Sequence, residues 1–138
     1  MSSIKDDFDR IALATLASED GAAHNDHYHS FLLQHLPPNC RHALEIGCGT
    51  GAFSRRLAKH SKAGSAGILP AVLALDLSPE MIRIARERST HFPNIDFQLA
   101  DILEFSLDDE SFDCIASIAT LHHLAFAEVL GKMKAALK

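Results

Sequence analysis

The sequence predicts an α/β fold in three layers, with helices flanking a parallel sheet of about four strands. From residue 40 to residue 138, short apolar segments alternate with segments whose apolar residues recur at helical spacing. This alternation indicates parallel strands joined by right-handed helical crossovers. The segment at 71–75 is wholly apolar, as expected of a strand that is covered on both faces.

Composition indicates one globular domain. The 138 residues are 47% hydrophobic, which is enough to build a core. A net charge of −5 argues against a protein that mainly binds nucleic acid or an anionic membrane. No apolar run approaches the roughly 20 residues that span a bilayer, and the amino terminus does not resemble a secretory signal. The three cysteines form no close pair, which is typical of reduced thiols, so we expect a cytoplasmic protein.

Two helices are expected ahead of the sheet, over 4–18 and 28–35. The second must end before Pro37, because a proline excludes its predecessor from the helical conformation. Residues 1–39 would then form a helical cap on a domain that spans 40–138.

Each element of that domain has a local signal. Strands are expected at 43–46, 71–75, 95–99 and 112–118. The helix after the first strand has Phe53 and Leu57 on one face and a polar face with Arg55, Arg56 and Lys59. Another helix should begin at Ser78-Pro79-Glu80, which supplies a hydroxyl cap, an initial proline and an acid in the first turn. Apolar side chains recur at helical spacing in the last helix, at Phe126, Leu130, Met133 and Leu137.

A glycine-rich turn follows the first strand. Gly47, Gly49 and Gly51 alternate with other residues, which permits a tight turn and the close approach of a ligand to the backbone. Gly47, Gly49 and Ala52 also satisfy the dinucleotide fingerprint, so the turn alone leaves a nicotinamide oxidoreductase open. A tight turn without a ligand is the remaining alternative.

Three acids stand near the carboxyl ends of the expected strands, where ligands bind in open α/β sheets. Glu45 lies two residues before the first glycine and suits a cationic group better than a pyrophosphate. Asp76 ends the second strand, where a carboxylate can accept both hydroxyls of a ribose. Asp101 follows the third strand and adds a polar contact to the same crevice. The alternative for each acid is a loop cap or a solvated carboxylate.

Four segments, in this order, resemble the motifs of class I S-adenosylmethionine-dependent methyltransferases. They are EIGCGTG at 45–51, LDLSPEM at 75–81, ADI at 100–102, and FDCIAS at 112–117 with LHH at 121–123. The resemblance implies a Rossmann-like transferase that uses S-adenosylmethionine and methylates a small-molecule acceptor. The alternative is a non-catalytic, truncated remnant or interaction module that at most binds the cofactor.

The resemblance also implies roles for the matching residues at the methionine end of the cofactor. The backbone of Gly47, Cys48 and Gly49 would pass under the methionine part. Glu45 would lie near its ammonium group, and the backbone near Ile118 would line the same end.

At the adenosine end, the resemblance implies that Asp76 holds the ribose hydroxyls. Leu77 and Met81 would pack against adenine. Asp101 would accept the adenine amino group, and the backbone amide of Ile102 would meet a ring nitrogen.

The residues indicate no catalytic base, because methyl transfer from a sulfonium mainly requires alignment and exclusion of water. His122 and His123 suit structural hydrogen bonds better than catalysis. No metal site is expected, since the spacing of His24, His27 and His29 with Cys40 matches no standard zinc pattern.

Relative to the family, we expect the last three strands to be missing from this chain. The fourth strand would then be an exposed edge of the sheet, which favours a homodimer through that edge. The absence of a basic stripe and of tryptophan argues against nucleic acid as a partner.

Overall fold

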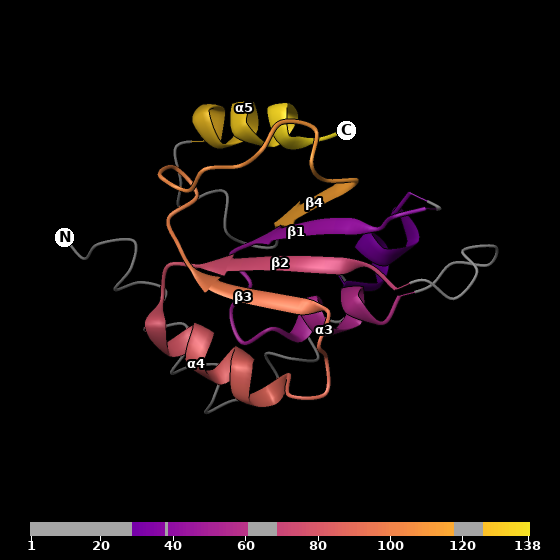
Figure 1. The fold of residues 1–138 in the computed structure, drawn as a ribbon, viewed down its shortest axis with the longest axis vertical. Helices are drawn as coiled ribbons and strands as arrows, with labels where there is room; N and C mark the ends of the chain where they lie inside the picture. Colours follow the sequence, from indigo (N-terminus) through magenta and orange to yellow (C-terminus); the bar gives the residue numbers. More distant parts are fainter. Residues whose placement is uncertain (1–28, 38, 61–68, 118–125) are drawn as a thin grey trace.

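The structure, a computed structural model, describes residues 29–37, 39–60, 69–117 and 126–138 (Figure 1). Its strands form one parallel sheet in the order β3-β2-β1-β4. They are β1 (His42–Ile46), β2 (Ala71–Asp76), β3 (Ile95–Leu99) and β4 (Cys114–Ser117). The predicted α/β class is confirmed, and each predicted strand is present.

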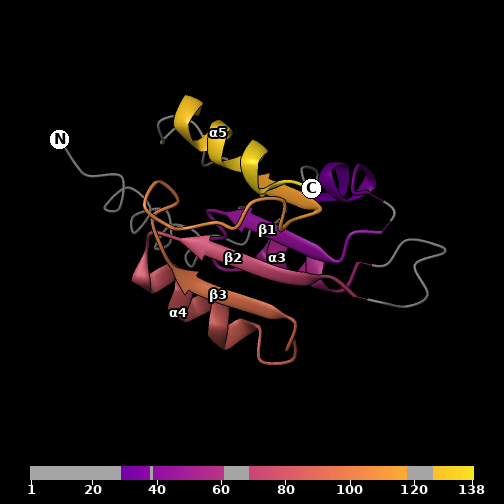
Figure 2. The same cartoon turned by 45° about the horizontal axis from the view of Figure 1, so that its top comes forward.

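Helices cover both faces of this sheet. They are α3 (Ala52–Ala58), α4 (Pro79–Arg88) and α5 (Phe126–Ala136). One core cluster joins side chains of α3 and α4 to the sheet, and a second cluster joins α5 to the opposite face. Figure 2 shows α5 on one side of the sheet and α4 on the other. The predicted three-layer arrangement is therefore confirmed.

The register of the strands explains why neighbouring residues serve different cores. Ala43 pairs with Val72 and packs with the α3 and α4 cluster, whereas Leu44 pairs with Leu73 and packs with the α5 cluster. Side chains alternate between the faces of a strand, so an apolar run can supply both cores. Both Ala43 and Leu44 are fully buried.

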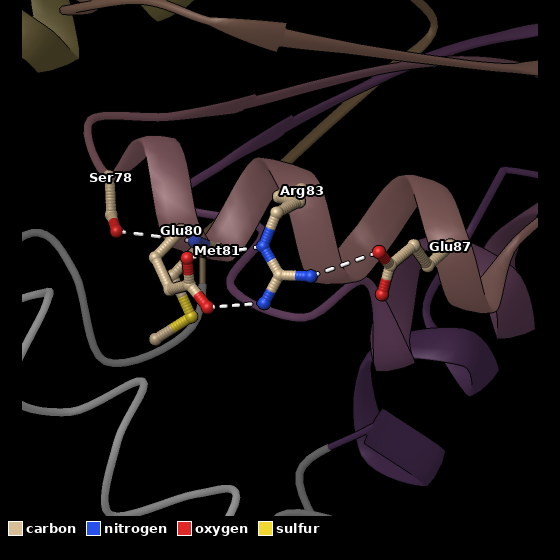
Figure 3. A network of polar contacts seen from close by, with 5 residues as sticks. All are labelled: Ser78, Glu80, Met81, Arg83 and Glu87. Atoms are coloured by element: carbon tan, nitrogen blue, oxygen red, sulfur yellow. Dashed lines mark hydrogen bonds and ion pairs between the residues drawn. The ribbon is translucent and has the colours of Figure 1, made fainter.

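Helix α4 begins as its sequence predicts. The Ser78 hydroxyl accepts a hydrogen bond from the Met81 backbone amide at 3.2 Å, which satisfies one of the unpaired donors of the first turn. Farther along, the exposed Arg83 side chain pairs with Glu80 and with Glu87 (Figure 3). Exposed pairs of this spacing stabilise a helix only slightly, so the cap and the buried face define this element.

Two predicted boundaries are corrected by the structure. The fourth strand starts at Cys114 rather than at Phe112, because the backbone of Phe112 bonds to the end of α5. Its amide donates to the Ala136 carbonyl and its carbonyl accepts from the Lys138 amide, both at 2.9 Å. In α5, Val129 and Ala136 are buried, while Leu130 is half-buried and Leu137 follows the helix.

Parts of the predicted amino-terminal cap lie outside the described residues. Helical residues extend over 29–34, within the second predicted helix, and the helix expected at 4–18 is not among the described ranges. Cys40, Cys48 and Cys114 are free thiols. In the described part of the chain, no helix has the length and apolarity needed to cross a membrane.

Candidate functional site

The glycine turn is bonded to the neighbouring strand. The backbone amides of Gly47 and Cys48 both donate to the Leu75 carbonyl, at 2.8 and 2.9 Å. Gly47, Gly49 and Gly51 have φ angles of 76°, 56° and 84°. Only glycine adopts this left-handed region without strain, so the alternate glycines predicted from the sequence are what allow the turn to form.

Asp76 connects the ends of three strands. Its Oδ2 accepts from the Gly49 amide at 2.8 Å and its Oδ1 from the Ser78 amide at 2.9 Å. Its backbone carbonyl accepts from Ala100 at 3.0 Å, just before Asp101. The Asp76 residue is only 3% exposed. This carboxylate therefore positions the glycine turn and the start of α4.

Glu45 is buried directly beneath the glycine turn. Its Oε1 accepts a hydrogen bond from the Ser54 hydroxyl of α3. Burial is the main reason that the pKa of Glu45 rises to about 8; the nearby Asp76 charge contributes to the rise, and the Ser54 hydrogen bond and the Arg55 charge oppose it. Glu45 is thus mainly protonated at neutral pH when no cation is bound beside it. Ser54 had no sequence signal beyond being a serine on the buried face of a helix.

The pKa of Glu45 predicts how stability depends on pH. Between pH 4.5 and about pH 8 the folded protein binds more protons than the unfolded chain, so the free energy of unfolding falls as pH rises. Over this pH range the titration of Glu45 lowers the free energy of unfolding by about 2 to 5 kcal/mol. We expect Glu45→Gln, whose amide keeps an acceptor for Ser54, to flatten this dependence. Urea unfolding at a series of pH values measures the dependence of the unfolding free energy on pH. Equal pH dependence in the unaltered chain and in Glu45→Gln would contradict this prediction.

Arg55, which was predicted on the polar face of α3, makes contacts that the sequence pattern did not indicate. It is half-buried, and its Nη1 donates to the Thr50 carbonyl at 2.9 Å and to the Ser89 hydroxyl at 3.0 Å. The long side chain reaches across from α3 to the end of α4, a contact that helical periodicity does not encode. Arg55 therefore stabilises the glycine turn through the Thr50 carbonyl and links it to the end of α4.

The turn after β3 holds Asp101 in a defined orientation. Asp101 Oδ1 accepts from the Leu103 amide at 2.9 Å, and its carbonyl accepts from the amides of Glu104 and Phe105. Ile102 is buried in the α5 cluster. Among the described residues, neither Asp101 Oδ2 nor the Ile102 amide has a hydrogen-bond partner. Adjacent residues therefore present one free acceptor and one free donor.

The remaining predicted site residues are placed differently. Met81 is buried, and its Sδ lies 3.9 Å from the position that a Cβ on Gly49 would occupy. Leu77 is half-buried. Cys48 is buried in the core, and this burial raises the pKa of its thiol, which makes it unreactive. Ile118, His122 and His123 lie outside the described residues.

The structure thus brings most of the predicted site residues together at the carboxyl ends of the strands. The glycine turn follows β1, Asp76 ends β2 and Asp101 follows β3, which is where open α/β sheets bind ligands. Within the described ranges, no group of three or more candidate ligands could hold a metal ion. His24 and His27 of the histidine cluster lie outside those ranges.

Sequence comparison identifies the family. Residues 43–138 match the family model described as a methyltransferase domain, a span that includes the glycine turn, Asp76 and Asp101. The chain belongs to this methyltransferase family. The resemblance of its motifs to the class I S-adenosylmethionine-dependent methyltransferase family is therefore confirmed.

Curated relatives of this methyltransferase chain are longer than the chain itself. An uncharacterized methyltransferase of Mycobacterium bovis is 33% identical over 100 residues, which cover 72% of this chain and 46% of that protein. The ubiquinone biosynthesis O-methyltransferase of Coxiella burnetii is 30% identical over 108 residues, covering 78% and 43%. The chain therefore spans less than half of the length of these two relatives.

Solved structures agree with this methyltransferase fold. A chain in the complex between a Haloferax volcanii methyltransferase activator and the putative methyltransferase superposes with a TM-score of 0.78 and 26% identity. That alignment covers 99% of this chain and 56% of the other. A Haemonchus contortus phosphoethanolamine N-methyltransferase gives a TM-score of 0.73 at 22% identity, covering 100% and 31%, and supports the fold alone.

Proposed function

We propose that this chain binds S-adenosylmethionine at the carboxyl ends of β1, β2 and β3 and directs its methyl group to a small-molecule acceptor. The observation that carries the proposal is the Asp76 carboxylate, which is bonded to the glycine turn on one side and to the start of α4 on the other. Family membership supports the same assignment.

The residues at the adenosine end fit such a ligand. Each oxygen of Asp76 accepts a backbone hydrogen bond, and a carboxylate oxygen can accept more than one, so Asp76 can also accept ribose hydroxyls. The free acceptor Asp101 Oδ2 and the free donor Ile102 N–H match the amino group and the adjacent ring nitrogen of adenine. Left-handed glycines keep side chains away from the path of the methionine part.

The chemistry then requires little of the protein beyond positioning. Bound S-adenosylmethionine supplies a sulfonium that activates its methyl carbon toward in-line displacement. The chain's own residues orient the nucleoside and exclude water from it. Glu45, whose pKa is raised to about 8, is mainly neutral at pH 7. Beside the ammonium group of a bound ligand Glu45 can ionise, and it would then release a proton when the ligand binds.

A small acceptor is supported by one relative, the Coxiella burnetii protein, which is named for ubiquinone biosynthesis. The reaction product S-adenosylhomocysteine offers the most direct test of the cofactor site, because it binds without turnover. We expect saturable one-site binding in calorimetric titration of the folded chain. Absence of binding by protein with native circular dichroism would refute the proposal.

The outer edge of β4 supports a second proposal, self-association. Among the described residues β4 pairs only with β1, so its other edge carries unpaired backbone groups. We expect sedimentation velocity over a concentration series to detect a homodimer or larger species of this chain. A monodisperse monomer at every concentration would contradict this prediction.

A further inference from the structure

Lys132 of α5 binds the turn that follows β3. Its Nζ donates to the backbone carbonyls of Ile102, Leu103 and Phe105, at 2.7, 3.0 and 2.8 Å. An ammonium group has three N–H donors, so these three carbonyls account for all of them. Lys132 is half-buried and forms no ion pair with an acid in the described part of the chain.

One peptide unit links Lys132 to Asp101. The carbonyl of Ile102 accepts from Lys132, and the amide of Leu103 in the same peptide donates to Asp101 Oδ1 at 2.9 Å. In a trans peptide the C=O and N–H point in opposite directions. Holding the carbonyl on Lys132 therefore aims the amide at Asp101 and leaves Oδ2 as the available acceptor.

We propose that Lys132 is a positioning residue for nucleobase recognition, acting through the 102–103 peptide on Asp101. The inference rests on the proposed function, because it assigns Lys132 to the adenine end of that same site. Lys132 does not touch the ligand in this scheme. It orders the turn in which the adenine-binding donor and acceptor lie, and it couples that turn to α5.

The test compares two ligands that differ along one edge of the base. S-adenosylhomocysteine carries the adenine amino group beside an unprotonated ring nitrogen, whereas S-inosylhomocysteine carries an oxygen beside a ring N–H. The second ligand therefore offers no amino group to Asp101 and no acceptor to the Ile102 amide. We expect the unaltered chain to prefer S-adenosylhomocysteine by about tenfold or more. Lys132→Met should reduce that preference to about threefold or less, and Lys132→Arg should restore part of it. Lys134→Met, on an exposed position of the same helix, should leave it unchanged.

Amide exchange gives a readout that needs no ligand. In Lys132→Met we expect faster exchange of the Leu103 amide, with the amides of β1 and β2 unchanged. Unchanged Leu103 exchange, or full retention of ligand preference in Lys132→Met, would overturn the inference. If the unaltered chain binds neither nucleoside, the proposed function fails first. If it binds both equally, only the assignment of Asp101 and Lys132 fails.

Discussion

Asp76→Ala is expected to abolish measurable binding of S-adenosylhomocysteine and to destabilise the fold. The substitution removes the acceptor of the Gly49 and Ser78 amides, which lie in partly and fully buried surroundings. Each buried donor left unpaired costs about 1 to 3 kcal/mol, so a total loss of about 2 to 6 kcal/mol follows for the two amides. The proposed acceptor of the ribose hydroxyls disappears as well, which should weaken binding at least about a hundredfold.

Asp76→Asn separates the two effects. An asparagine keeps one oxygen acceptor and the shape of the side chain, so it should lose less stability than alanine while still binding the nucleoside poorly. Calorimetric titration and urea unfolding of both variants measure the pair of effects. Asp96→Ala, which removes an exposed acid of β3, is the matched control and should change neither. Full affinity in folded Asp76→Asn would exclude Asp76 as a main ribose contact.

Gly51→Ala is expected to be the most destabilising single-methyl change in the turn. Gly51 has a φ of 84°, and a Cβ there would lie 2.9 Å from Arg55 Nη1 and 3.0 Å from Phe97 Cζ. Left-handed backbone costs a residue with a side chain about 1 to 2 kcal/mol, and overpacking adds about 1 to 3 kcal/mol. The Arg55 side chain can move aside, but the Phe97 ring is buried in the core.

Gly131→Ala supplies the contrasting control. Gly131 lies in α5, and nothing comes within 4 Å of the position that its Cβ would take. Replacing a glycine inside a helix by alanine should raise stability by about 0.5 to 1 kcal/mol. Urea denaturation of both variants measures the change in the free energy of unfolding, which we expect to be a loss for Gly51→Ala and a gain for Gly131→Ala. Equal stability of Gly51→Ala and the unaltered chain would mean that the turn relaxes freely.

The local architecture could be predicted from the sequence because its signals are local. The apolar runs of β1 and β2, the glycines of the turn and the Ser78 cap each depend on residues within one or two turns of chain. Their order along the chain was also enough to indicate which strand ends would carry the acids of the site.

Only the tertiary structure decided which groups form hydrogen bonds with those acids or hold them in place. Glu45 and Ser54, or Asp101 and the peptide held by Lys132, come together only once the strand order and the rotation of each helix on the sheet are set. The same packing turns Val129 rather than Leu130 into the core and buries Glu45, which raises its pKa to about 8. Such contacts depend on long-range packing, and no short sequence pattern encodes them.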